Sequence, residues 1–204
     1  MDQLRRKIEN FFSDKYLLSD KGIIRFESEI IDIDPILWLM NQSSKLKTYW
    51  SDREGHFQLA GIGEADIISS NTLDEFQSSL SGCYEKLKDH YPDLKYYGGM
   101  CFNRDGAGSN EWREFCNYRF HIPACEVYRK NGKTLFALNY NNTGERSVNE
   151  ILKDINELID RINFSIGIKV SSLPMIMGRS DLTDKTEWKK KDQSDQRRYK
   201  IRRI

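Results

Sequence analysis

The three histidines are the side chains of this sequence best suited to metal binding or proton transfer. His56, His90 and His121 are far apart and fall in different expected elements. No H-x-x-x-H or E-x-x-H spacing places two ligands on one helix face, and no serine elbow or Cys–His pairing indicates a nucleophile. Asp and Glu are plentiful, so a carboxylate pair stays open, but without spacing cues we interpret them as solvated faces or helix caps. The sequence therefore predicts no catalytic, metal-binding or cofactor-binding residue.

Two glycine-containing segments could bring the backbone close to a ligand. Gly61-Ile62-Gly63 lacks the third glycine, the Lys-Ser/Thr pair and the following helix that a phosphate loop requires. We interpret it as a strand end at which the backbone lies close to another segment. Gly98-Gly99, inside an aromatic strand, has the same interpretation.

The cysteine pattern and the N-terminus indicate a reducing compartment. The cysteines are Cys83, Cys101, Cys116 and Cys125, and none of them forms a C-x-x-C pair. The charged start of the chain has no apolar stretch behind it, so it does not read as a signal peptide. We expect reduced, mostly buried thiols in a cytoplasmic protein. No run approaches the roughly 20 apolar residues that cross a bilayer, so we expect no membrane partner.

Charge is balanced overall but not along the chain. The whole chain has 32 Lys and Arg against 31 Asp and Glu, a net charge of +1, which argues against a dedicated nucleic-acid binder. Residues 185–204 have nine basic and three acidic residues, and 189–198 contain no apolar side chain. Without an apolar face to bury, this tail is expected to be disordered or frame-shifted. Residues 1–184 are expected to form one domain, and binding of RNA by the tail is the less favoured alternative.

Helices are predicted where apolar residues recur at intervals of three and four. One covers residues 2–16, and a short one follows Asp34, which caps it ahead of Pro35. Another begins at Thr72 with a capping box, and the clearest begins at Ser147, also with a capping box. A further helix start is expected within residues 183–188.

Strands are predicted between these helices. They open at residue 22, form a hairpin over 47–63, and continue at 95–102. After a polar, glycine-rich loop at 103–111, strands near 118–129 and 133–140 are joined by Lys-Asn-Gly, a strong hairpin signal. Strands and helices interspersed through hairpins predict an α+β fold with a largely antiparallel sheet and flanking helices.

Five segments resemble one family in the right order. Residues 49–55 (YWSDREG) and 60–65 (AGIGEA) are similar to a YWSDR-x-G…AGIGEAD segment, and residues 97–102 (YGGMCF) to a YGGMRF strand. Residues 112–123 resemble W-x-x-F…YRFVLP and residues 135–139 a TLACN strand, while residues 179–188 resemble R-x-D-x-P-D-x-x-x-W. These are segments of isochorismate synthases, in particular the menaquinone-specific type, in the chorismate-binding enzyme family. The resemblance covers residues from about 1 to 188.

The resemblance implies a fold, a reaction and a cofactor. The fold would be the N-terminal half of the chorismate-binding, anthranilate synthase-like fold, with a layered antiparallel sheet core and helices outside. The reaction would be the Mg²⁺-dependent conversion of chorismate to isochorismate for menaquinone or siderophore synthesis. In this family a lysine base activates water, a glutamate acid helps to expel a hydroxyl group, and glutamates hold the magnesium ion that anchors the substrate carboxylate.

Those catalytic residues belong to the C-terminal half of the family. After Trp188 the expected amphipathic helix and the K-x-V-L-A-R strand have no counterpart, and Lys200 cannot be aligned with the catalytic base. Thr183 stands where the family often has proline, and Cys101 where it often has arginine. We therefore expect a truncated or frame-shifted relative that is inactive and binds no Mg²⁺ alone. The alternatives are a subunit completed by a separately encoded catalytic half, and a non-catalytic protein-binding module.

Overall fold

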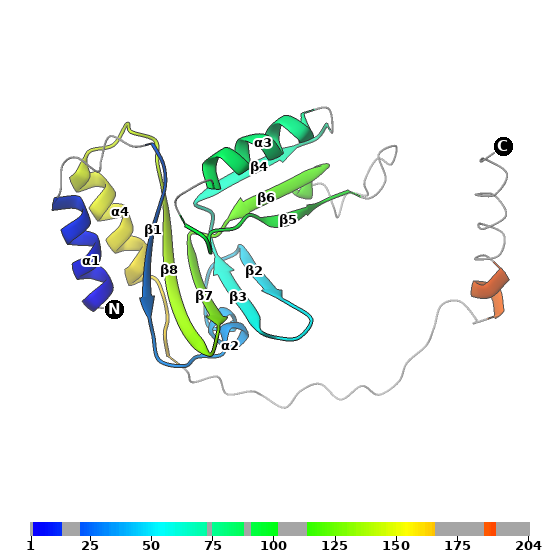
Figure 1. Cartoon of the computed structure of the whole chain (residues 1–204), viewed down its shortest axis with the longest axis horizontal. Coiled ribbons are helices and arrows are strands. Elements are labelled where there is room, and N and C mark those ends of the chain that lie inside the picture. Colours follow the sequence, from blue (N-terminus) through cyan, green and yellow to red (C-terminus); the bar gives the residue numbers. More distant parts are fainter. Residues whose placement is uncertain are drawn as a thin grey trace. The chain divides into compact units, whose positions relative to one another are not determined.

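The structure is a computed structural model that describes residues 2–13, 21–72, 75–87, 91–101, 114–165 and 186–190. The chain divides into two units, Met1–Ile168 and Lys169–Ile204. The first unit holds all the labelled helices and strands (Figure 1), and the second is described only as a short helical stretch at 186–190.

A five-stranded antiparallel sheet forms the centre of the first unit. Its order is β1-β8-β7-β3-β2. The strands are β1 (Gly22–Glu29), β2 (Lys47–Ser51), β3 (Phe57–Ile62), β7 (Cys125–Lys130) and β8 (Lys133–Asn142). The predicted hairpins at 47–63 and around residues 130–132 are both present. Asn131 and Gly132 have φ values of 52° and 75°, as a two-residue hairpin turn with two left-handed positions requires.

Three further strands form a second antiparallel sheet. Its order is β4-β6-β5, with β4 at Asp66–Ser70, β5 at Tyr97–Met100 and β6 at Tyr118–Ile122. Helix α3 (Phe76–Leu87) packs on this sheet through the rings of Phe76 and Tyr118, whose centroids are 5.1 Å apart.

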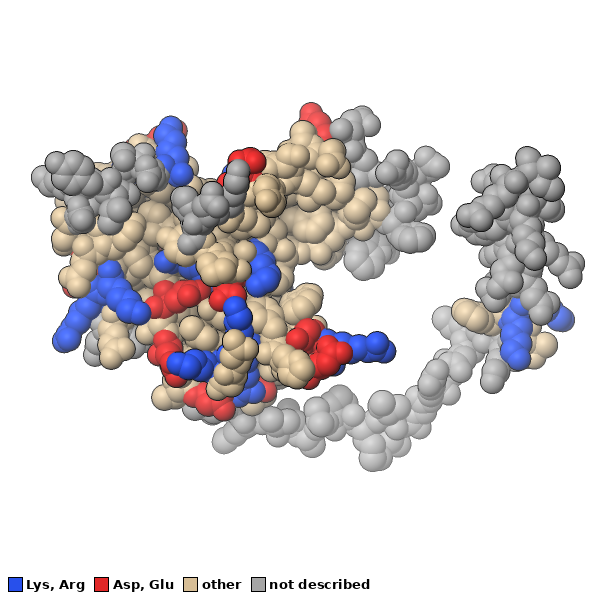
Figure 2. All heavy atoms as spheres, in the orientation of Figure 1, with Lys and Arg blue, Asp and Glu red and all other residues tan. Residues whose placement is uncertain are grey.

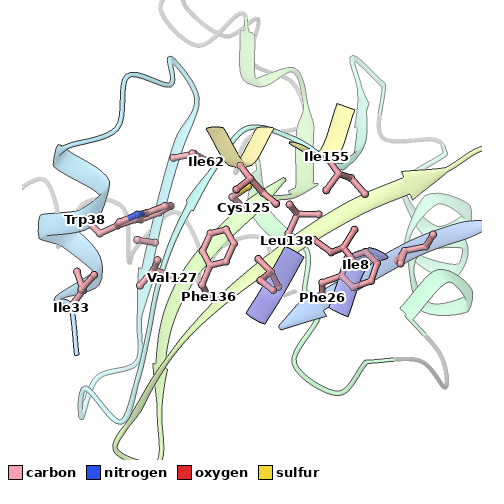
Figure 3. Packing of buried hydrophobic residues seen from close by; sticks show 14 of the residues in the cluster. Ile8, Phe26, Ile33, Trp38, Ile62, Cys125, Val127, Phe136, Leu138 and Ile155 are labelled. Atoms are coloured by element: carbon pink, nitrogen blue, oxygen red, sulfur yellow. The ribbon is translucent and has the colours of Figure 1, made fainter. Parts of the chain in front are cut away.

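Three helices cover one face of the five-stranded sheet. They are α1 (Asp2–Ser13), α2 (Pro35–Met40) and α4 (Val148–Asp160). Figure 3 shows Ile8 of α1, Trp38 of α2 and Ile155 of α4 directed toward Phe136 and Leu138 of β8. All five side chains are almost completely buried, and each large apolar side chain removed from water contributes about 2 kcal/mol. The apolar periodicity of the sequence therefore predicted the buried faces of α1 and α4.

Helix starts follow the sequence at two of the three predicted caps. The Asp34 carboxylate accepts hydrogen bonds from the N–H groups of Ile36 and Leu37. Ser147 and Glu150 form the predicted capping box at the start of α4.

The predicted start at Thr72 was wrong, because α3 begins at Phe76. The Thr72 N–H donates to Ser70 Oγ at 3.1 Å, and the two hydroxyl groups share a hydrogen bond of 3.3 Å. The side chain that was expected to cap the helix is therefore held at the end of β4. The helix instead begins with a hydrogen bond from the Ser79 N–H to the Glu75 carbonyl at 2.9 Å.

The predicted strand at 118–129 is two strands that belong to different sheets. Pro123 has no N–H group to donate, and the chain changes sheet there. The carbonyl of Pro123 accepts from the Asn139 amide, and that of Ala124 accepts from the Asn139 N–H, both at 2.8 Å. Strand β4 was not predicted at all.

The α+β prediction with largely antiparallel sheets is confirmed. The predicted loop at 103–111 lies outside the described residues, as does most of the tail, so the boundary near residue 184 stays a prediction. All four cysteines are free, and Cys83 and Cys125 are buried. Within the described ranges, no helix combines the length and the apolar character needed to cross a membrane.

Candidate functional site

A pocket of about 400 Å³ lies beside the end of β8, the connection from β8 to α4, and the second half of α4. The connection between β3 and β4 contributes Glu64 and Ala65, and the connection between β6 and β7 contributes Ala124. Strand β8 contributes Asn139 and Asn141. The connection between β8 and α4 and the helix α4 itself supply the rest of the lining, so the pocket is assembled from segments that are far apart in the sequence.

The pocket lining is acidic. Its charged side chains are three carboxylates, Glu64, Glu145 and Asp154, against the single guanidinium group of Arg146. Arg146 forms an ion pair with Asp154, and Glu64 pairs with Arg119 at 2.5 Å. A lining with this charge favours a cation or a neutral polar molecule and repels a dicarboxylate.

The carboxylate of Asp66 connects the second sheet to the pocket wall. It pairs with Lys86 at 2.7 Å, accepts a hydrogen bond from the Tyr96 hydroxyl, and accepts one from the Asn141 amide at 3.1 Å. Burial, followed by the Asp66 carboxylate, raises the pKa of Tyr96, so this hydroxyl stays a donor. Asn141 is thereby fixed at the edge of the pocket.

A buried ionic network lies behind the pocket, on the face of the five-stranded sheet opposite α1. Arg25 Nη1 donates to Glu126 Oε2 at 3.0 Å and to Asn139 Oδ1 at 2.8 Å, and Arg25 Nε donates to Glu27 Oε1 at 2.5 Å. The Asn139 amide donates to Glu126 Oε1 at 2.9 Å. The side chains of Arg25 and Glu126 are both completely buried. Asn139 therefore joins the pocket to the charges beneath it.

The network holds two carboxylates against one guanidinium group. Burial raises the pKa of Glu126, although Arg25 acts in the opposite direction. Burial alone would lower the pKa of Arg25, but Glu126 and Glu27 outweigh it and raise this pKa above its usual value. Arg25 consequently stays charged and depends on its two carboxylate partners.

The described histidines are not brought together. His121 is buried in β6, and its Nε2 lies 2.8 Å from the hydroxyl oxygen of Thr48 on β2. Burial lowers the pKa of His121, which favours the neutral ring. His56 is exposed in the β2–β3 turn, and His90 lies outside the described residues. Within the part of the chain that the structure describes, no three His, Cys, Asp or Glu side chains are grouped so that they could hold a metal ion.

The close backbone approaches predicted at the glycines are present. A Cβ atom on Gly61 would lie 2.6 Å from Pro123 Cγ, and one on Gly98 would collide with the Arg119 carbonyl oxygen. Gly61 therefore lets β3 pass directly beneath the Pro123 turn that leads to the pocket.

The sequence profile described as "Chorismate binding enzyme" matches residues 10–202 of the chain. That is nearly its whole length. The chain belongs to this family. No curated protein sequence matches the chain.

A solved structure supports the fold of this chorismate-binding family member. The chain is similar to MenF, the menaquinone-specific isochorismate synthase from Escherichia coli, with a TM-score of 0.50 and 19% sequence identity. The similarity covers 82% of this chain and 35% of the MenF chain, so the chain spans about a third of that enzyme. At this identity the likeness shows the shared fold, including the antiparallel sheets and the helices that cover them.

The family segments meet at the pocket. Glu64 and Ala65 come from the AGIGEA segment, Ala124 directly follows the segment that ends at residue 123, and Asn139 closes the LFALN segment. Sequence reasoning missed the pocket because these residues belong to different connections. One signal was present for the network below it: Glu126 is a charged residue between Cys125 and Val127, in a run that is otherwise apolar.

Proposed function

We propose that this chain serves in the Mg²⁺-dependent conversion of chorismate to isochorismate, as the N-terminal part of the enzyme, and that it does not catalyse the reaction by itself. The acid, the base and the magnesium ligands come from residues outside those described. This assigns to the chain the menaquinone-specific type of activity that the solved relative is named for.

The convergence of the family segments on one pocket is the observation that carries this proposal. Segments at 60–65, 112–123 and 135–139 are separated by strands of both sheets, yet residues from or next to each of them line the same 400 Å³ space. A shared fold alone requires the strands, but it does not require the connections to meet. We infer that this pocket is the surface at which the N-terminal part contributes to a complete active site.

The charge of the pocket supports the need for further residues. Chorismate is a dicarboxylate, and the lining presents three carboxylates with one guanidinium group that is already paired with Asp154. Magnesium or additional cationic side chains would have to bring the substrate to such a surface. Asn139 and Asn141 would then act as polar groups that orient the bound molecule.

A complementation assay tests the proposal. The chain is mixed with a separately expressed C-terminal catalytic part of a menaquinone-specific isochorismate synthase, in the presence of chorismate and Mg²⁺, and isochorismate is measured by chromatography. Turnover in the mixture and in neither part alone is the expected result. The matched variants are Asn141→Ala, which faces the pocket, and Asn131→Gly, which lies in the distant β7–β8 turn; only the first should lower turnover. Equal turnover with both variants would contradict the assignment of the pocket.

A further inference from the structure

The two edge strands of the five-stranded sheet differ in chemistry. Strand β1 ends with two accessible charged residues, Glu27 and Glu29. Lys7 Nζ also donates to the outward carbonyl oxygen of Glu27 at 2.9 Å, so that group is not free to pair with another strand. Strand β2 has an uncharged centre, where Tyr49 is 41% exposed and Trp50 is 45% exposed. Charged residues and covering side chains protect an edge from pairing with another chain, and β2 lacks both at its centre.

The backbone of β2 presents a regular set of free hydrogen-bonding groups. The Asp52 N–H donates to the Phe57 carbonyl at 3.0 Å, and the Gly63 N–H donates to the Leu46 carbonyl at 3.2 Å. In an antiparallel pair only alternate residues bond to the partner strand, so even-numbered residues of β2 face β3. The N–H and C=O groups of Lys47, Tyr49 and Ser51 therefore point away from β3, and no described strand pairs with them.

We propose that this edge of β2 pairs with β2 of a second copy of the chain, antiparallel about a two-fold axis at Tyr49. In this register Tyr49 lies opposite Tyr49 of the second copy, and Lys47 lies opposite Ser51. All six outward N–H groups of the two strands then meet outward carbonyl groups, which gives six hydrogen bonds. The three outward residues are symmetric about Tyr49, so the edge is complementary to itself.

The charges beside β2 favour the same partner. The strand begins at Lys47, preceded by Lys45, and is followed by Asp52, Arg53 and Glu54, which together have a net charge of −1. Antiparallel pairing brings the basic end of each strand to the end of the other that has a net charge of −1, where Lys45 lies directly opposite Arg53 in this register. Figure 2 shows acidic and basic side chains gathered at the tip of the β2–β3 hairpin, beside this edge. A five-residue strand pair is a small interface, so the dimer should be weak, with a Kd on the order of 10 µM or higher.

Sedimentation velocity of the full chain over low to high micromolar concentrations tests the proposal. The expected result is a concentration-dependent monomer–dimer equilibrium that requires neither chorismate nor Mg²⁺. Tyr49→Pro should abolish the dimer, because it removes an outward N–H group while the bonds from β2 to β3 remain. A monomer at all concentrations, or a monomer that associates only with an added catalytic half, would overturn the proposal.

Ser51 gives a matched pair of variants that tests the register. Ser51→Lys places like charges opposite each other twice per dimer and should raise the Kd about fivefold, whereas Ser51→Glu should lower it by a similar factor. Combining Ser51→Lys with Lys47→Glu should restore association. Circular dichroism verifies that each variant is folded. Kd changes of the same sign for both Ser51 variants would contradict the register.

Discussion

Removing Glu126 from the network behind the pocket should destabilise the chain severely. Glu126 is completely buried and supplies one of the two carboxylates that hold Arg25, which is itself completely buried. In Glu126→Leu the guanidinium group keeps the Asn139 amide oxygen and one carboxylate, that of Glu27, whose side chain is 34% exposed. Breaking a buried ion pair by deleting one partner costs about 3–5 kcal/mol, because the other charge is left without compensation.

The double variant separates the ion pair from simple packing. Combining Glu126→Leu with Arg25→Met removes both buried charges and leaves Asn139 with the Pro123 carbonyl as an acceptor for its amide. The remaining cost should be about 1–3 kcal/mol, from the unpaired Asn139 carbonyl oxygen.

Urea unfolding followed by tryptophan fluorescence measures these free energies. The expected result is a double variant that is more stable than Glu126→Leu alone. The single variant Arg25→Met completes the comparison. If the free energy of unfolding lost in the double variant equals the sum of the losses in Glu126→Leu and Arg25→Met, the two charges are not coupled and the reasoning is refuted.

Three other substitutions test the account at separate positions. Gly98→Ala should lower the free energy of unfolding in urea by about 3 kcal/mol, because the added Cβ would collide with the Arg119 carbonyl. Gly99→Ala is the control and should be nearly neutral, because no neighbouring atom lies within 4 Å of its added Cβ. Equal losses in the two variants would contradict the close approach. Burial lowers the pKa of His121, so the unfolded chain takes up a proton there near pH 6.5 and the folded chain only at lower pH. The free energy of unfolding should therefore fall as the pH falls through 6.5. The variant His121→Gln should flatten this slope, and an unchanged slope would show that another group causes it. Ser147→Ala should lower the free energy of unfolding by about 1 kcal/mol, because it removes the cap of α4. A urea midpoint equal to that of the unsubstituted chain would contradict a stabilising role of the cap.

Local sequence signals predicted most of the fold. The capping boxes, the Asn-Gly turn and the helical periodicity each specify a conformation within a few residues, so α1, α2, α4 and the two hairpins could be placed from the sequence. The start of α3 could not be placed, because the Thr72 hydroxyl forms a hydrogen bond with the Ser70 hydroxyl at the end of β4 instead of capping the helix. The sequence contains Pro123 inside the predicted strand, but it does not reveal that the chain changes sheet there. That change is known only because β6 and β7 belong to different sheets.

The site could not be predicted because its residues meet only in three dimensions. Asn139 looks like an ordinary strand residue until Arg25 and Glu126 are seen to bond to it. The prediction that the chain carries no catalytic or metal-binding residue stays a prediction. Family segments were a better guide than residue chemistry: they predicted the fold, and residues from or beside three of them line the pocket.

Incubation of the purified chain with chorismate and Mg²⁺, with isochorismate quantified by chromatography, tests the central claim most directly. We predict no product above a protein-free blank, at any chain concentration, because we propose that the acid, the base and the magnesium ligands of the reaction lie outside the described residues. Isochorismate formed by this chain unaided, in proportion to its concentration, would contradict it.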